Sequence, residues 1–450
     1  MNIPDVIADL KPSLSTWSAD ATRYISEHFQ ESAQIAYGSI WIHISDNEYQ
    51  ESTPVFVLKP ESAETLRGLP SYHALDRAVR QSSVLSPMLG RLVGTHRSLL
   101  RFSTWTLANA FLPRINELMT AHAPPFADRY NVINRQLAEQ EIEYDAICPI
   151  QGIGFEDERI ELAEDLAIER LSPDEICRAL ETGAIPIVFF DRFEASDSNS
   201  FALKKRVRVP VIVRESGRQG ASPDLSAAQP FINLLQTFED VVTLQQCFAL
   251  MTDERIQVSS ILMAAREGGF LGSDTGTQNQ TISLNWRPDS GLIFGASRCV
   301  DLRRIWRILH GDALLGDKAL GLALRRLSFA TQRTMPEDRL LDVFIAAEAF
   351  YRKEADERRD RGGSTGLRVA ERAATWSEGT LPGWSRDEVF QQMRSGYRAR
   401  NAVAHGDGPK ADNLKVMGKQ ASLDEVVRAT EGIVRSGLYK AIQQLPETQG

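Results

Sequence analysis

The stretch SRDEVFQQMRSGYRARNAVAHGDGP, residues 385–409, decides the fold expected for the C-terminal part of the chain. It begins with Ser385, a favourable N-cap residue, followed by two carboxylates in the first turn, where the helix dipole favours negative charge. At the other end Gly406 can take the left-handed conformation that terminates a helix, and a Gly-Pro pair then prevents continuation. We therefore expect a helix over 385–405, with His405 at its C-terminal end.

The sequence around this segment predicts helices from about residue 301 onward, because apolar residues recur there at helical spacing. The expected helices cover 301–310, 313–332, 336–358, 364–377, 385–405 and 422–444. Short connections join them, so we expect an all-α helical bundle over residues 301–450.

The first 300 residues follow a different pattern, with short apolar runs between turn-forming residues. We expect a mixed α/β region over residues 1–145 and a strand-rich region with helices, a candidate sensor or regulatory part, over 146–300. The predicted elements are strands at 41–47, 53–60, 146–155, 184–190 and 206–214, helices at 98–119, 172–181 (capped by Ser172, with Pro173 next) and 230–251, and linkers at 214–229 and 266–281. The predicted fold class is therefore α+β.

Composition argues against a membrane protein and against a zinc protein. No run of about 18 uncharged apolar residues occurs, and the N-terminus lacks the apolar core of a signal peptide, so we expect a cytoplasmic protein. The cysteines form no CxxC pair and have no nearby histidine that would complete a zinc site. We expect four buried thiols: Cys148, Cys177, Cys247 and Cys299.

Charge is unevenly divided along the chain. Residues 301–450 hold 25 Lys and Arg against 21 Asp and Glu, a net charge of +4, whereas the first 300 residues hold 26 against 39, a net charge of −13. The basic part can accept a phosphate backbone, and the acidic part should repel bulk nucleic acid.

The helix over 385–405 also carries residue types that suit phosphodiester chemistry. Tyr397, Asn401 and His405 follow one another at i, i+4 and i+8, so they share one face. An imidazole can move protons near neutral pH, and an amide can orient it or bind a phosphate oxygen. Guanidinium groups hold phosphate, and the helix has three near this face: Arg394, Arg398 and Arg400.

The run Arg400-Asn401-Ala402-Val403-Ala404-His405 resembles the signature of the HEPN superfamily, an Arg followed by four to six residues and then His. The wider run YRARNAVAHG looks like the Apea-like HEPN branch, although members of this branch often have Ser where Asn401 stands. The segment PEDRLLDVFIAAEAFYRK is similar to the first helix of that branch, with Glu348 in its apolar run. A simpler role for Glu348 is that of an ion-pair partner for an arginine, either Arg400 or Arg394, which would hold the active arginine in place.

Spacing alone is not specific, because five of the seven histidines follow an arginine within the same range of four to six intervening residues. The polar residue after Arg400, the helix end at His405 and the matching upstream helix distinguish this pair. The nearest rival is RRIWRILHGD, whose arginines stand among bulky apolar residues. We expect that segment to be a packed helix with a basic edge.

The resemblance implies a metal-independent endoribonuclease without cofactor, in which the ribose 2′-hydroxyl attacks the adjacent phosphate. Its catalytic residues would be Arg400, His405 and Asn401, with substrate-binding or support roles for Tyr397, Arg394, Arg398 and Glu348. It also implies a homodimer or higher even oligomer, an RNA target such as tRNA, a phage-derived trigger, and a toxin-like role in antiphage defence by abortive infection.

Two alternatives stay open at this point. The helical part could be a non-catalytic module that binds RNA or nucleotide, dimerises, and regulates another activity. Alternatively, the first 300 residues could hold the enzyme, with active residues that converge only in space.

Overall fold

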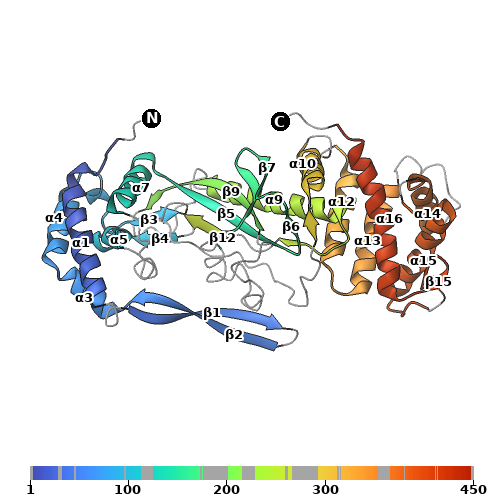
Figure 1. Ribbon diagram of the computed structural model, residues 1–450, viewed down its shortest axis with the longest axis horizontal. Helices are drawn as coiled ribbons and strands as arrows, with labels where there is room; N and C mark the ends of the chain where they lie inside the picture. The colour runs from blue at the N-terminus through green and yellow to red at the C-terminus, as the bar shows by residue number, and fades with distance from the viewer. Residues whose placement is uncertain are drawn as a thin grey trace.

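A computed structural model of the 450-residue chain describes residues 4–28, 33–44, 47–95, 98–112, 125–172, 175, 201–214, 229–258, 262–265, 292–311, 314, 316–352, 365–379, 381–410, 412 and 414–446. These residues form both helices and antiparallel sheet, so the predicted α+β class is confirmed. The molecule is elongated: helices lie at both ends, and the largest sheet lies between them (Figure 1).

The N-terminal end is a group of helices that surround a buried tryptophan. They are η1 (Ala8–Leu10), α1 (Lys11–Glu27), α3 (Pro60–Arg67), α4 (Pro70–Gln81), η2 (Ser86–Met88), α5 (Thr104–Ala110) and α7 (Phe126–Glu139). Trp17 is fully buried and contacts the rings of Tyr72 and Trp105, at centroid distances of 5.4 and 6.1 Å. The hairpin of β1 (Ala33–Ile44) and β2 (Asn47–Leu58) extends from these helices along the body (Figure 1).

The middle of the molecule is an antiparallel sheet of six strands in the order β11-β5-β9-β8-β7, with β12 also paired to β5. Its strands are β5 (Glu141–Gln151), β7 (Arg159–Ala163), β8 (Leu166–Arg170), β9 (Phe201–Pro210), β11 (Gln257–Val258) and β12 (Leu262–Ala265). Smaller sheets pair β3 (Leu92–Thr95) with β4 (Ser98–Arg101) and β10 (Ile212–Arg214), β6 (Gly154–Phe155) with β13 (Ile293–Phe294), and β14 (Lys415–Val416) with β15 (Lys419–Gln420).

Helix α9 (Gln229–Met251) connects the sheet to the C-terminal helices, because it packs on β9 and also on α10, α12 and α16. The C-terminal helices are α10 (Ala296–His310), α12 (Lys318–Gln332), α13 (Pro336–Tyr351), α14 (Thr365–Trp376), α15 (Arg386–Ala404) and α16 (Leu423–Gln443). Helix α13 packs against α12, α14, α15 and α16, so it lies at the centre of this group.

Most predicted elements agree with the structure in type, but some differ in extent. The single strands expected over 146–155 and over 206–214 are each divided between two sheets, the first as β5 and β6 and the second as β9 and β10. The helix expected over 98–119 is wrong at its start, because Ser98–Arg101 is strand β4, paired with β3. The helix begins only at Thr104, where the Ser103 side chain accepts a hydrogen bond from the Thr106 amide at 3.2 Å and acts as N-cap. The strand expected at 184–190, Cys177, Pro173 and nearly all of both predicted linkers fall outside the described residues.

Two further findings concern expectations from composition. Within the described ranges, no helix is both long and apolar enough to span a membrane. The three cysteines that the structure describes, Cys148, Cys247 and Cys299, are buried free thiols.

Candidate active site in the C-terminal helices

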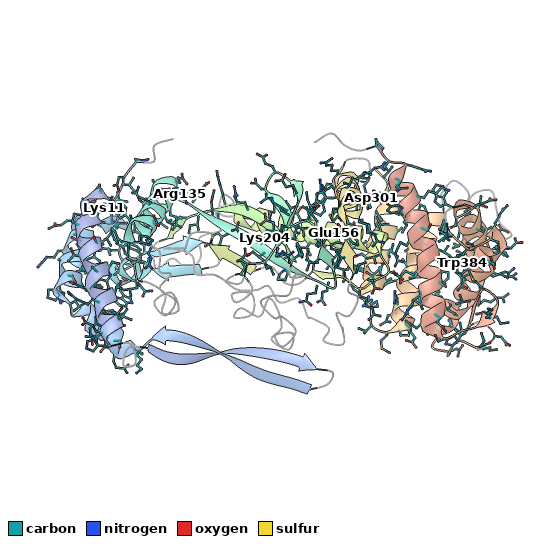
Figure 2. All side chains as sticks on the ribbon, in the orientation of Figure 1. Lys11, Arg135, Glu156, Lys204, Asp301 and Trp384 are labelled. Atoms are coloured by element: carbon teal, nitrogen blue, oxygen red, sulfur yellow. The ribbon has the colours of Figure 1, made fainter. Side chains whose placement is uncertain are left out.

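The start of α15 is fixed by a capping box, in which Ser385 is the N-cap residue that the sequence predicts. The Ser385 hydroxyl accepts a hydrogen bond from the Glu388 amide at 3.3 Å, and the Glu388 carboxylate accepts one from the Ser385 amide at 2.8 Å. These hydrogen bonds lower the pKa of Glu388. Trp384, the residue before the N-cap, lies among the C-terminal helices at one end of the elongated molecule (Figure 2).

The other end of α15 places His405 in solvent. Gly406 has φ +79°, and its amide donates to the Val403 carbonyl at 3.0 Å, while the Asp407 amide donates to the Ala402 carbonyl at 2.9 Å. This pair of hydrogen bonds is a Schellman motif. His405 is the C-cap residue, at the helix end where the sequence predicts it, and it is exposed, so its imidazole can reach an external substrate.

Arg400 lies one turn before this end and points toward α13. Its Nη2 atom lies 3.6 Å from Oε1 of Glu348, and its Nη1 atom donates to Oδ1 of Asn401 at 3.1 Å. Arg400 and Glu348 are each 24% exposed at the side chain, so the ion pair is partly shielded but open to solvent. The structure therefore brings together three of the predicted site residues.

The aromatic ring of Tyr397 lies next to the guanidinium of Arg400. The guanidinium carbon of Arg400 lies 5.6 Å from the centre of the Tyr397 ring, and Phe344 meets the same ring edge-on at 5.4 Å. Helix α14 approaches the ring closely at Gly366, where an added Cβ atom would lie 2.4 Å from Cδ1 of Tyr397. Only glycine leaves room for the ring in this position.

The environment of Tyr397 raises the pKa of its phenol. Burial is the largest cause, and the charge of Glu348 and a hydrogen bond to that carboxylate add to it. The positive charges of Arg400 and Arg352 act in the opposite direction. The hydroxyl is therefore a hydrogen-bond donor at neutral pH, which fits a positioning role.

The remaining predicted site residues are more peripheral. Arg394 and Arg398 lie exposed on α15, where they can add positive charge at the surface. The side chains of Arg394, Arg398 and His405 form no hydrogen bond or ion pair with any residue that the structure describes.

Arg352 is a residue that the sequence analysis missed. It is the exposed C-cap residue of α13, and its charge acts on Tyr397 together with that of Arg400. The signal was present, because Arg352 follows Glu348 by one helical turn in the segment PEDRLLDVFIAAEAFYRK.

His310, the histidine in the competing segment RRIWRILHGD, contacts other side chains within the fold. Its Nε2 atom lies 3.3 Å from Oδ1 of the buried Asp240, whose other oxygen accepts from Lys205 Nζ at 2.6 Å. The His310 ring lies 4.1 Å from that of Trp306, centre to centre. These contacts join α10 to α9 and β9, so the prediction of a packed helix is confirmed.

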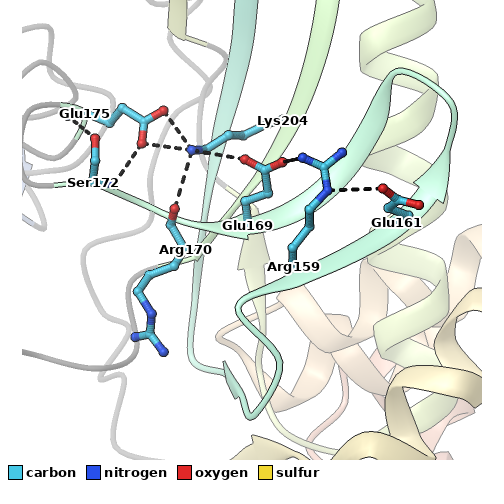
Figure 3. Close-up of polar contacts among 7 residues, drawn as sticks. All are labelled: Arg159, Glu161, Glu169, Arg170, Ser172, Glu175 and Lys204. Carbon is cyan, nitrogen blue, oxygen red and sulfur yellow. Dashed lines mark hydrogen bonds and ion pairs between the residues drawn. The ribbon is translucent and has the colours of Figure 1, made fainter.

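A second charged cluster lies on the central sheet (Figure 3). Lys204 Nζ donates to Glu175 Oε1 at 2.7 Å and lies 3.5 Å from Glu169 Oε2, while Arg159 pairs with Glu169 and with Glu161. Acids and bases alternate along this cluster, which joins β7, β8 and β9 to the segment at Ser172. Ser172 and Glu175 exchange hydrogen bonds as a capping box, which confirms the predicted N-cap.

Comparison with protein-family models, with curated proteins and with solved structures gave no match to this chain.

Proposed function

We propose that this chain is an endoribonuclease of the HEPN type that cleaves RNA without a metal ion and without a cofactor. The observation that carries the proposal is the arrangement at the end of α15. A partly buried arginine sits against Glu348, Asn401 and Tyr397, and a solvent-exposed histidine follows at the C-cap of the same helix.

These groups match the needs of phosphodiester cleavage by an internal nucleophile. The ribose 2′-hydroxyl would attack the adjacent phosphorus, forming the new P–O bond as the bond to the 5′-oxygen breaks. His405 would take or deliver a proton, and Arg400 would stabilise the charge that develops on the phosphate oxygens. The products would be a 2′,3′-cyclic phosphate and a 5′-hydroxyl, and DNA would not react because it lacks the nucleophile.

One imidazole per chain supplies one proton-transfer group, whereas cleavage benefits from both an acid and a base. We therefore propose that two copies act together as a homodimer, or in a higher even oligomer, with Arg400 and His405 near the interface. The first 300 residues, whose net charge is negative, would restrain the nuclease until a trigger, such as a phage product, arrives. In this setting cleavage of tRNA or other cytoplasmic RNA would serve antiphage defence by abortive infection; this step is an analogy with the family.

A second candidate is a non-catalytic HEPN module that binds RNA or nucleotide and dimerises. The contacts of Arg400 with Glu348 and Asn401 favour this second candidate, because they give the arginine a structural role that needs no substrate.

The test is RNA cleavage in EDTA by the wild type, Arg400→Ala and His405→Ala, repeated in extracts of phage-infected cells. His73→Ala is a matched control, because His73 is exposed and follows Arg67 at comparable spacing. The proposal requires that the first two substitutions abolish cleavage and that the control retain it. Binding of RNA without cleavage in either setting would favour the binding module.

A further inference from the structure

The charged clusters that lie away from Arg400 and His405 differ in how far they reach the surface. Glu431 of α16 is 1% exposed and accepts Arg339 of α13 at 2.6 Å, and it also pairs with Arg435 on its own helix. The side chains of these two arginines are 5% and 12% exposed. This cluster is closed to an external partner, so its role is to join α13 to α16. The cluster on α12 is open to solvent.

Helix α12 has an exposed face on which cations alternate with apolar side chains. Its opposite face is buried, and the helix packs against α9, α13 and α16. The residues of the exposed face are spaced three or four positions apart, so they form one stripe along the helix: Lys318, Leu322, Arg325, Phe329 and Arg333. This α12 stripe is about 22 Å long at the ordinary rise of a helix. Its two apolar residues are 37% and 40% exposed.

Cations outnumber acids along the α12 stripe. Residues 318–335 contain no Asp or Glu, and they contain four basic residues: Lys318, Arg325, Arg326 and Arg333. The nearest acids in the sequence are Asp317, whose carboxylate accepts from the Leu320 amide at 3.0 Å as the N-cap, and the two at 337–338 that begin α13. Lys318 and Arg325 form no hydrogen bond or ion pair with any residue that the structure describes. Both can therefore bind an external anion.

A buried carboxylate orients the other two arginines. Asp342 of α13 is 5% exposed, and its oxygens accept Nη1 of Arg326 at 2.9 Å and Nε of Arg333 at 3.0 Å. The two arginine side chains are 35% and 49% exposed, and a guanidinium has more donors than this contact uses. One carboxylate therefore fixes two partly exposed cations without cancelling their charge. Donors that are already oriented lose less freedom when they bind a phosphate.

Phe329 places an aromatic ring among these cations. The guanidinium carbon of Arg326 lies 5.9 Å from the centre of the ring, and Arg325 and Arg333 lie one helical turn before and after it. An exposed ring flanked by cations suits a single-stranded nucleic acid, because a base can stack on the ring while the cations bind phosphates. The apolar residues of the α12 stripe are separated by charges. A membrane-binding helix has a continuous apolar face, and the core of a protein interface is depleted of charge.

We propose that the α12 stripe binds single-stranded RNA, with Phe329 stacking on a base and the cations of the stripe contacting phosphates. The stripe lies outside the proposed nuclease centre, which α13 and α15 form, but α12 packs directly against α13 (Figure 1). It would therefore add affinity for RNA and take no part in the chemical step. The identification of the bound strand as the RNA to be cut rests on the proposed function, whereas binding itself does not.

Binding of a fluorescently labelled oligouridylate to the full-length His405→Ala protein tests the proposal without interference from cleavage. We expect the Kd to rise steeply with salt. In this background Phe329→Leu keeps an apolar side chain but removes the ring, and it should weaken binding about five-fold or more. Phe329→Tyr keeps the ring and should retain the affinity. Arg325→Gln should weaken binding and lower the slope of log Kd against log salt concentration by about 0.7, the value for one phosphate contact with a single strand.

Two control variants remove similar side chains elsewhere on the surface. Val213→Ala shortens an apolar residue of β10 that is 43% exposed. Arg23→Gln removes an arginine of α1 whose side chain is 68% exposed. Both should bind the oligouridylate as tightly as the His405→Ala parent does.

The proposal is overturned if the parent does not bind the oligouridylate, or if either Phe329→Leu or Arg325→Gln leaves the affinity unchanged. It is also overturned if vesicles of anionic phospholipid, and not RNA, bind in a way that depends on Phe329, because the stripe would then face a membrane. Failure of the nuclease proposal would give a different result, in which the wild type binds RNA through Phe329 and leaves it uncut.

Discussion

Arg400 and Glu348 face each other across α15 and α13 with their closest charged atoms 3.6 Å apart, a distance longer than a direct hydrogen bond. The carboxylate therefore attracts the guanidinium without locking it. Arg400 can keep a defined position and still turn its donors toward a substrate phosphate.

Glu348→Gln should lower the rate of RNA cleavage about ten-fold, because the isosteric amide keeps the shape of the site but no longer attracts Arg400. The free energy of unfolding should change by less than about 1 kcal/mol, since partly exposed ion pairs contribute little. Cleavage rates and urea unfolding check both parts. Glu371→Gln, at an exposed position on α14, is the control; an unchanged rate in Glu348→Gln would remove the positioning role.

Gly366→Ala should disturb the same site through packing. The new Cβ atom would lie 2.4 Å from the Tyr397 ring, so ring or helix must shift, at a cost of about 1–3 kcal/mol in unfolding free energy. Gly432→Ala is the matched control, because it lies within α16 with no atom within 4 Å of an added Cβ. That substitution should stabilise the protein by up to about 1 kcal/mol. An equal loss of unfolding free energy in the two variants, measured by urea unfolding, would argue against a close contact at Gly366.

Glu431→Gln should destabilise the fold by about 3 kcal/mol or more, because two buried arginines lose their carboxylate. Asp424→Asn on the same helix breaks the exposed pair with Arg428 and should cost less than about 1 kcal/mol. Chemical unfolding of the two variants measures the difference. Similar small effects would show that the buried network does not hold α13 to α16.

Helices α15 and α16 each begin with a capping box, formed by Ser385 with Glu388 and by Ser422 with Glu425, and these boxes predict a dependence of helix stability on pH. Hydrogen bonds from Ser385 and Ser422 lower the pKa of Glu388 and Glu425 from the ordinary value of 4.5. A lowered folded-state pKa means that the contribution is complete above pH 4.5 and is lost as the pH falls through the lowered value. Glu388→Gln should therefore show a shallower loss of stability below pH 4.5 than the wild type, measured by thermal unfolding. Identical acid profiles would contradict this.

The helix ends of the candidate site were predictable from the sequence, because capping is local. Ser385, Glu388 and Gly406 lie within a few residues of the backbone groups that they satisfy, and the structure confirms each role. The misplaced start of the helix over 98–119 has the opposite cause. The apolar run from Ser98 to Arg101 is compatible with either helix or strand, and it forms a strand because it pairs with β3.

The charged networks were not predictable, since they join distant residues. Arg339 and Glu431 are 92 positions apart, and nothing in either neighbourhood indicates that they pair. Glu348 was selected through its resemblance to a family segment, and its contact with Arg400 agrees with that choice.

The most direct test of the central claim is the chemistry of the product ends. A short RNA and the same sequence with a single 2′-deoxy substitution at the cleaved position would be incubated with the wild type and His405→Ala in EDTA. The account predicts that only the wild type cuts, only at positions with a 2′-hydroxyl, and leaves 2′,3′-cyclic phosphate ends. Cleavage of the deoxy-substituted position, or equal cleavage by His405→Ala, would contradict it.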